Sequence, residues 1–180
     1  MGDGEGITTS ARYLAPSAPG QGGAWGREAA AEGRRGSQRI VQAGEVAAPE
    51  PVADLLGLAR GEHVVARRRI MYLDDEPCEL TDTYYPREIG SGTGLAGTVR
   101  IPGGAVRLLA DLGHVGVRAQ EAVSARMPTE SEREALAMGP GEPVLQLTRL
   151  TLDAAGRPVQ ADVMVMVSRD RRLRYEIEIG

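Results

Sequence analysis

The stretch of sequence that decides the fold runs from Glu121 to Val167 and reads EAVSARMPTESEREALAMGPGEPVLQLTRLTLDAAGRPVQADVMVMV. Its beginning, residues 120 to 126, alternates in polarity and predicts a β-strand that ends before Pro128. Alternation returns at 144–152 and again at 159–167, and each run predicts a further strand. We therefore expect this stretch to form part of a sheet.

A short helix is expected between the first two of these strands. Thr129 and Glu132 form a T-x-x-E capping box, in which each side chain accepts a hydrogen bond from the other residue's backbone N–H. The helix is expected to continue through Met138, after which Gly139 and Pro140 close it.

The last two strands are expected to form a β-hairpin, because residues 153–158, DAAGRP, supply turn chemistry between them. Side chains alternate across a strand, so Arg149 shares a face with Leu145 and Leu147. One face of the next strand carries Gln160, Asp162, Met164 and Met166. A buried arginine or glutamine needs hydrogen-bond partners, from the protein or from a ligand.

Three spaced motifs in this stretch resemble the UTRA domain, the effector-binding half of HutC-type GntR transcriptional regulators, particularly those of actinobacteria. They are E-x-V-S-A-R-x-P-T-x-x-E from Glu121, G-x-P-V-L-x-x-x-R ending at Arg149, and D-x-x-G-R-P-V from Asp153. The resemblance covers roughly residues 39 to 179. It implies an antiparallel α+β fold of the chorismate-lyase type.

The composition limits the classes of fold and function that the chain can have. A chain of 180 residues with 42% apolar content suits one domain with a real core, and a net charge of -4 gives no footprint for a nucleic-acid surface. The single Cys78 excludes an intramolecular disulfide, and two histidines with one cysteine are too few for an ordinary zinc site. We expect no metal, no cofactor and no membrane span, and the cytoplasm is the default compartment.

Residues 1–38 are rich in Gly, Ala, Ser and charge, which predicts a flexible linker or N-terminal arm. Trp25 and residues 28–32 leave open a brief helix in an ordered arm. In the resembled family this position connects to a winged-helix DNA-binding domain. None precedes residues 39–180, the expected ligand-binding domain, so we expect a fragment or a stand-alone effector domain.

The remaining elements also favour an antiparallel α+β domain of about six strands with short helices. We expect strands at 39–46, 63–73, 78–85 and 173–179, helices at 51–56 and 105–112, and a mobile glycine-rich loop at 87–100. On the strand 63–73 the even positions are the more apolar and are expected to pack on the core, which leaves Arg67 and Arg69 on the opposite face.

This arginine strand is the first candidate effector site, since a guanidinium holds a carboxylate or phosphate through two parallel bonds. Ordinary exposed arginines on a solvated strand are the alternative. The resemblance implies a ligand contact for Arg69, whose counterpart binds the ligand in phosphosugar-binding UTRA domains. The second arginine of that subgroup is replaced by Met71, which argues against a phosphorylated sugar.

Gly103 and Gly104, before the helix at 105–112, are the second candidate, because their backbone N–H groups could cradle an anion. The alternative is a turn that needs flexible backbone angles. Phosphosugar-binding relatives place hydroxyl side chains here, and this sequence has none.

The third candidate is a set of polar side chains on the strand 78–85. Thr81, Thr83 and Tyr85 share one face of this strand, and Tyr84 lies on the opposite face. Several relatives carry glutamate at the positions of Thr81 and Gln160. A pocket without these carboxylates should favour a less hydroxylated or less cationic effector. Met71, Met164 and Met166 are expected either to make this pocket apolar or to be ordinary core residues.

Two further groups are expected to be structural. Glu121 and Arg149 lie on facing strands and are expected to form an ion pair, with ligand contact as the alternative. The basic cluster Arg169, Arg171, Arg172 and Arg174 is expected to be a solvated turn and strand edge.

The sequence is thus interpreted as a small-molecule sensor that pairs as a homodimer and meets DNA only through a winged-helix domain. The first alternative is an enzyme of the chorismate-lyase type, in which Arg69 and Glu121 hold a carboxylated substrate. No nucleophile with a base, metal set or carboxylate pair supports that alternative. The second is a dimerising antagonist of full-length relatives.

Overall fold

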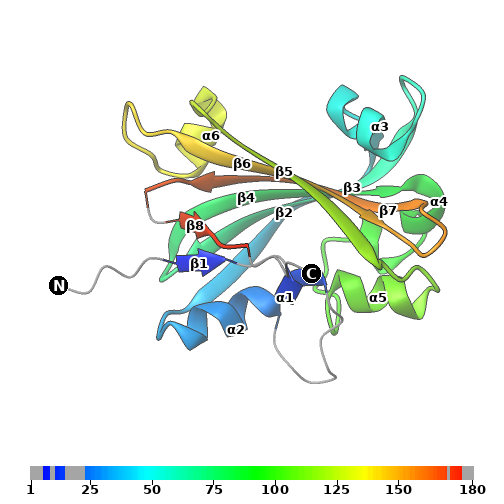
Figure 1. The fold of residues 1–180 in the computed structure, drawn as a ribbon, viewed down its shortest axis with the longest axis horizontal. Coiled ribbons are helices and arrows are strands. Elements are labelled where there is room, and N and C mark those ends of the chain that lie inside the picture. The colour runs from blue at the N-terminus through cyan, green and yellow to red at the C-terminus, as the bar shows by residue number, and fades with distance from the viewer. Residues whose placement is uncertain (1–5, 9–10, 15–22, 170, 176–180) are drawn as a thin grey trace, which may run out of the picture.

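A six-stranded antiparallel sheet forms the centre of the fold, in the strand order β2-β3-β4-β7-β6-β5 (Figure 1). The structure is a computed structural model, which describes residues 6–8, 11–14, 23–169 and 171–175. The strands are β2 (Gly36–Ala47), β3 (His63–Leu73), β4 (Glu76–Pro86), β5 (Arg118–Arg126), β6 (Val144–Leu152) and β7 (Pro158–Val167). The expected antiparallel α+β class and the 144–167 hairpin are confirmed.

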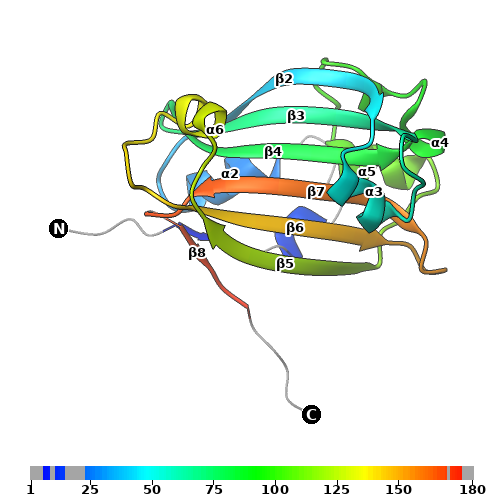
Figure 2. The same ribbon diagram turned by 90° about the horizontal axis from the view of Figure 1, so that it is seen from above.

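Short helices cover both faces of this sheet (Figures 1 and 2). On one side lie α3 (Glu50–Leu56) and α6 (Glu130–Ala135), and we call this side the α3 face. The opposite side, the α5 face, is covered by α1 (Ala11–Leu14), α2 (Ala24–Ala31), α4 (Arg87–Gly90), η1 (Gly94–Ala96) and α5 (Ala105–Asp111). No helix among the described residues is long and apolar enough to cross a membrane.

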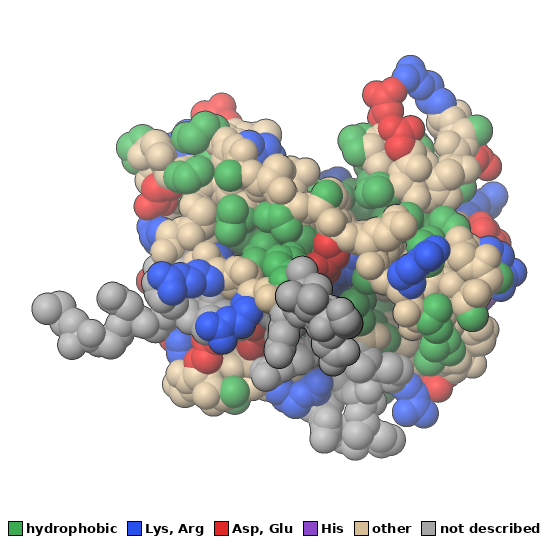
Figure 3. Space-filling model, viewed as in Figure 1, with side chains coloured by type: hydrophobic (Ala, Val, Ile, Leu, Met, Phe, Trp, Pro, Cys, Tyr) green, Lys and Arg blue, Asp and Glu red, His purple; other side chains and the backbone are tan. Residues whose placement is uncertain are grey.

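The α3 face carries two apolar clusters, and one of them holds helix α3. Val52 and Leu56 of α3 pack on Val64 and Tyr84 of the sheet, and Gly57 ends α3 in the left-handed conformation with φ 68°. The predicted helix 51–56 is therefore confirmed. Between the raised helices α3 and α6 the surface is hollowed (Figure 3).

The even side of β3 packs on the core as expected, and the α5 face is buried as well. Val65 and Met71, at odd positions, are 0% and 5% exposed. One apolar cluster lies toward α5 and consists of Val65, Tyr85, Ile89, Leu95, Leu109 and Val159. A second lies toward the other end and consists of Leu147, Met164 and Met166, with Leu145 and Leu173 packed against them.

The expected mobile loop at 87–100 is wrong, because α4 and η1 pack this segment onto the sheet. Leu95 is 0% exposed and Ile89 is buried in the same cluster. Gly90 comes so close to β3 that an added Cβ would lie 2.7 Å from Cβ of Val65. Two single turns separated by glycines leave no apolar period, so the sequence pattern could not reveal them.

The region before the sheet is an ordered arm from Gly23 onward rather than a linker. Trp25 of α2 is buried, and its Nε1 donates to the backbone oxygen of Tyr72 at 3.0 Å. Nearer the N-terminus, β1 (Gly6–Thr8) pairs in parallel with β8 (Arg171–Leu173). β8 overlaps the expected last strand at 173–179 only at Leu173, residues 174 and 175 are not in a strand, and residues 176–179 lie outside the described part of the chain.

The basic cluster near the C-terminus is only partly a solvated surface. The Arg171 side chain is 6% exposed, lies 3.6 Å from Oε2 of Glu79, and stacks over the Trp25 ring at 4.8 Å. The solvated interpretation is therefore wrong for Arg171. Arg169, in contrast, is half exposed and forms a surface ion pair with Glu142 at 2.7 Å.

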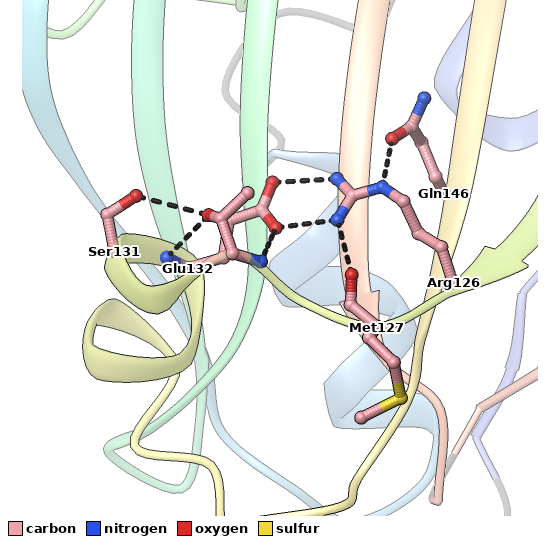
Figure 4. Close-up of polar contacts among 6 residues, drawn as sticks. Arg126, Met127, Ser131, Glu132 and Gln146 are labelled. Atoms are coloured by element: carbon pink, nitrogen blue, oxygen red, sulfur yellow. Dashed lines mark hydrogen bonds and ion pairs between the residues drawn. The ribbon is translucent and has the colours of Figure 1, made fainter.

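The capping box of α6 is confirmed and is extended by Arg126 (Figure 4). Glu132 N–H donates to Oγ1 of Thr129 at 3.2 Å, and Thr129 N–H donates to Oε2 of Glu132 at 2.8 Å. Both Nη atoms of Arg126 donate to the Glu132 carboxylate at 2.7 Å, and its Nε donates to Gln146 of β6 at 2.7 Å. One carboxylate therefore fixes the helix start to strands β5 and β6.

Helix α6 ends at Ala135, three residues before the expected end at Met138. Ala137 takes a left-handed conformation with φ 50°, which an uninterrupted helix does not allow. This turn directs Met138 into the core against Val144 and Val165.

The Arg126 guanidinium, by hydrogen bonding, lowers the pKa of Glu132 below its ordinary value of 4.5. Since the folded-state pKa is depressed, the stabilisation is present above pH 4.5 and is lost as the pH falls through the folded pKa. We expect Glu132→Gln to lower the unfolding free energy at pH 7 by about 2 kcal/mol. Urea denaturation between pH 7 and pH 3 should show this difference narrowing with acidity.

Glu130→Gln is the matched control for this experiment, because the Glu130 side chain is 80% exposed in the same helical turn. Its effect should stay below about 0.5 kcal/mol. A Glu132→Gln effect that is independent of pH would show that the charge of Glu132 does not stabilise the helix start.

Candidate functional site

A line of polar side chains crosses the middle of the α5 face, one from each of five strands. The strand register aligns Arg67 of β3, Thr83 of β4, Asp162 of β7, Arg149 of β6 and Glu121 of β5. We call these five residues the polar row. Neighbouring strands lie about 5 Å apart, so adjacent members of the row are within side-chain reach of one another.

The centre of the polar row is a buried ion network around Arg149. Its Nε lies 2.6 Å from Oε1 of Glu121, and its Nη1 lies 3.9 Å from Oδ2 of Asp162. Asp162 also accepts hydrogen bonds from Thr83 at 2.7 Å and from Gln160 at 2.8 Å. The expected pairing of Glu121 with Arg149 is confirmed, and burial makes this network a structural tie between strands.

Arg67 lies at one end of the polar row, and its guanidinium donates hydrogen bonds to backbone carbonyls. Its guanidinium donates to the oxygens of Gly94 at 3.2 Å, Gly97, and Val99 at 2.9 Å. Burial lowers the pKa of Arg67, and the positive charge of Arg69 acts in the same direction. Arg67 therefore holds the η1 segment in place and has no carboxylate partner among the described residues.

Arg69, beside the row on the same face, has an open donor. Its Nη2 donates to Oγ1 of Thr83 at 3.0 Å and its Nη1 reaches Gln38 at 3.5 Å, whereas its buried Nε has no hydrogen-bond partner. Within the described ranges no carboxylate pairs with it. A guanidinium in this state can accept an anionic or strongly polar ligand group without first losing an ion pair.

The hydroxyl of Tyr85 is a second open group on this face. Tyr85 is 1% exposed, and in the described part of the chain its hydroxyl makes no hydrogen bond. Burial raises its pKa, which Arg69 and Arg67 oppose and Asp162 reinforces. The phenol therefore stays neutral and keeps its O–H as a donor.

Five other predicted site residues share this face but have protein partners or lie in its core. Thr81 donates to Oε1 of Glu79 at 2.5 Å, and Gln160 donates to Asp162. Met164 and Met166 belong to the apolar cluster around Leu147, and Met71 is buried on the same side of β3.

Three predicted residues lie apart from the polar row. Tyr84 is on the α3 face, where it packs on Val64 and is 3% exposed. Gly103 and Gly104 have φ 76° and 86°, which only glycine adopts readily and which agree with the turn alternative. Sequence reasoning omitted Asp162 from the site, although its alternation with Gln160 and Met164 already placed it on this face.

The enzyme alternative required Arg69 and Glu121 to act together, and the strand order separates them. Arg69 lies on β3 and Glu121 on β5, with β4, β7 and β6 between them. Glu121 instead pairs with Arg149 and accepts a hydrogen bond from the Tyr175 hydroxyl at 3.3 Å. The proposed pair is therefore wrong.

Two cavities among the described residues lie away from the polar row. One of about 60 Å³ lies under α2 and is lined by residues that include Trp25, Glu28, Cys78 and Arg171. Another of about 290 Å³ lies beside α3. Neither includes a member of the polar row, so unpartnered polar groups rather than these cavities define the candidate site.

Solved structures share this architecture. The effector domain of PhnF from Mycobacterium smegmatis superposes with a TM-score of 0.73 at 18% identity, over 86% of this chain and 94% of that one. The C-terminal domain of the histidine utilization repressor from Pseudomonas syringae pv. tomato superposes with a TM-score of 0.65 at 21% identity, over 81% and 100%. The fold is thus that of the effector domains of bacterial transcriptional regulators.

The UTRA domain model matches residues 31–170, most of the chain, and the chain belongs to the UTRA family. A curated relative, an uncharacterized HTH-type transcriptional regulator (SCO4628) from Streptomyces coelicolor, is 29% identical over 156 residues. That alignment covers 85% of this chain and 58% of the relative, so the chain spans somewhat more than half of the relative's length. The resemblance inferred from the sequence motifs is confirmed.

The ion network can be tested by removing its central cation. Arg149→Met leaves Glu121 and Asp162 buried without their shared partner, and should lower the unfolding free energy by about 3–5 kcal/mol. Arg68→Met is the matched control, because Arg68 pairs with Asp82 while 46% exposed. Its cost should be about 1 kcal/mol or less in the same urea titration.

A double variant separates charge from packing. Adding Glu121→Gln to Arg149→Met removes one of the two carboxylates that have lost their arginine partner, so the double variant should be more stable than Arg149→Met alone. Equal or lower stability of the double variant would contradict the electrostatic account.

Proposed function

We propose that this domain senses a small-molecule effector and thereby changes how a winged-helix domain of the whole protein binds DNA. Membership of the UTRA family supports the class of function. The observation that supports effector binding at this site is the buried Nε of Arg69, which has no hydrogen-bond partner. A buried unsatisfied donor on a charged group is costly, and a ligand acceptor removes that cost.

The effector is held by Arg69, with the Tyr85 hydroxyl as a second donor on the same face. Thr83 links the site to the rest of the row, because it accepts from Arg69 and donates to Asp162. Ligand binding therefore acts on a network that extends across β4, β7, β6 and β5. An effector that binds one arrangement of this network more tightly shifts the population toward it.

The role is regulatory and non-enzymatic in this proposal, and the protein acts in the cytoplasm, where its DNA target lies. The relatives support it: one is an HTH-type transcriptional regulator and another is a repressor of histidine utilization. DNA contact is assigned to a winged-helix domain and not to residues 39–180.

A homodimer is part of the proposal. Within the described residues β5 has a neighbouring strand on one side only, and Val117, Val123 and Met127 on and beside it are 62%, 44% and 57% exposed. An apolar sheet edge of this kind is suited to pairing with a second copy.

Light scattering should give a molar mass of twice 19.1 kDa, and Val123→Lys should shift this mass toward that of the monomer. A monomeric unmodified chain would contradict the dimer.

Effector binding can be tested by a thermal-shift screen of the purified chain against sugars, sugar phosphates, amino acids and monocarboxylates. A compound present at 100 times its Kd stabilises the folded state by about 2.7 kcal/mol and so raises Tm. We expect at least one compound to do so, and Arg69→Ala to abolish the shift.

Arg68→Ala is the control, because Arg68 lies next to Arg69 in β3 but on the α3 face, where it pairs with Asp82. It should leave the shift intact. A hit that Arg69→Ala and Arg68→Ala affect equally would contradict binding at Arg69, and the absence of any hit would contradict effector sensing by this domain.

A further inference from the structure

Two elements cover β3 on the α5 face from opposite ends, and Arg69 lies between them. At one end Val65 belongs to the same apolar cluster as Leu95 of η1, and Arg67 donates to the η1 backbone. At the other end Leu73 lines the cavity under α2. The odd-numbered residues of β3 share this face, so Arg69 is the middle one of the five. Figure 1 shows α2 toward one end of the face and α5 toward the other.

The guanidinium of Arg69 extends toward the part of the face that α2 covers. Helix α2 packs against the first residue of β2 so closely that a Cβ added at Gly36 would lie 2.9 Å from Cβ of Ala29 and 2.9 Å from Nε1 of Trp25. Gln38, two residues further along the same face of β2, accepts from Nη1 of Arg69 at 3.5 Å. Residues two apart on a strand are about 7 Å from one another. The arginine therefore ends one such step from the seat of α2.

The η1 cover is firmly held. Leu95 is 0% exposed within an apolar cluster that includes Ile89 and Leu109, and burial of a whole leucine side chain is among the larger single contributions to stability. Arg67 adds hydrogen bonds to the backbone oxygens of Gly94 and Val99. Lifting η1 would expose the leucine and remove the partners of a buried guanidinium, so we expect this cover to stay closed.

The α2 cover is held by fewer contacts. Its buried residues are Trp25, Glu28 and Ala29, so a carboxylate takes one of the three buried positions. A cavity of about 60 Å³ remains under the helix. Trp25 supplies two specific contacts, the hydrogen bond to the backbone oxygen of Tyr72 and the stacking with Arg171. A segment that buries little apolar surface opens locally at a lower free-energy cost than the core, so α2 is the cover more easily released.

We propose that α2 is a lid on the effector site: the effector reaches Arg69 only after α2 has moved away from β2, so docking of α2 and effector binding exclude one another. This inference rests on the proposed effector-sensing function and adds how its site is regulated. The apparent affinity for the effector is then the intrinsic affinity multiplied by the fraction of molecules with α2 released. The family model matches residues 31–170, so α2 (Ala24–Ala31) lies almost entirely before the matched region.

Two glycines allow α2 to be loosened or tightened without a change in the effector site. Gly36→Ala places a Cβ 2.9 Å from Ala29 and Trp25, so α2 must move. Gly26→Ala lies inside α2, where its Cβ meets the Gly36 oxygen at an ordinary 3.7 Å, and alanine favours a helix over glycine by a factor of about five. Gly139→Ala, in the turn after α6 with its first contact at 3.7 Å, is the control.

The experiment needs no ligand. Trp25 is the only tryptophan of the chain, so quenching of its fluorescence by acrylamide reports the docking of α2. Modification of Arg69 by phenylglyoxal, mapped by mass spectrometry, reports access to its guanidinium. Gly36→Ala should raise both readouts, with Arg69 modification at least about fivefold higher, and Gly26→Ala should lower both. Gly139→Ala should change neither, and Arg67 should remain unmodified in all variants because η1 covers it.

Circular dichroism establishes that each variant is folded, and if Gly36→Ala does not fold, the decrease expected for Gly26→Ala decides. Equal Arg69 modification in the folded variants and the unmodified chain would overturn the lid, and so would equal quenching of Trp25. A compound from the thermal-shift screen should bind Gly36→Ala more tightly and Gly26→Ala more weakly than the unmodified chain. Equal affinity would overturn the lid and leave effector sensing standing. The expected modification pattern without any hit would retain α2 as the cover of Arg69 and reject the proposed function.

Discussion

The rest of the structure depends on the burial of Arg149 between Glu121 and Asp162. Three strands contribute one charge each, and none of these charges can be buried alone without a large desolvation cost. The network therefore fixes the register of β5, β6 and β7, since a slip of one residue would turn Arg149 to the α3 face, away from both acids. The apolar clusters on either side determine stability, and this network determines which pairing of strands is stable.

The same requirement is the reason for proposing the effector site on β3. Each arginine on the α5 face has a different solution to burial: Arg149 has carboxylates, Arg67 has carbonyls, and Arg69 has a hydroxyl and an amide with one donor left over. Fixed partners make the first two part of the scaffold. The third is held in position by Thr83 and Gln38 but is incompletely satisfied, which is the arrangement expected of a group that awaits a ligand.

The parts predicted from the sequence are those whose signals are local. The capping box of Thr129 and Glu132, the stop at Gly57 and the alternation of β6 and β7 each depend on neighbours within a few residues, and all three are present. Segment 87–100 could not be predicted and the α2 arm could only be left open, because tertiary contacts, Arg67 to Gly94 and Trp25 to Tyr72, hold them. Alternation grouped the candidate residues by face within each strand, but it could not show which arginine had a donor without a partner.

The parallel pairing of β1 with β8 joins the two ends of the described chain outside the main sheet. Because the two strands run in the same direction, tension applied at the beginning of β1 and at the end of β8 pulls them past one another. The hydrogen bonds between them would then be loaded together in shear rather than opened one by one. A mechanical pull on the two ends would therefore reach this small two-stranded sheet first, and the six-stranded sheet that carries the candidate site would be shielded until it gave way.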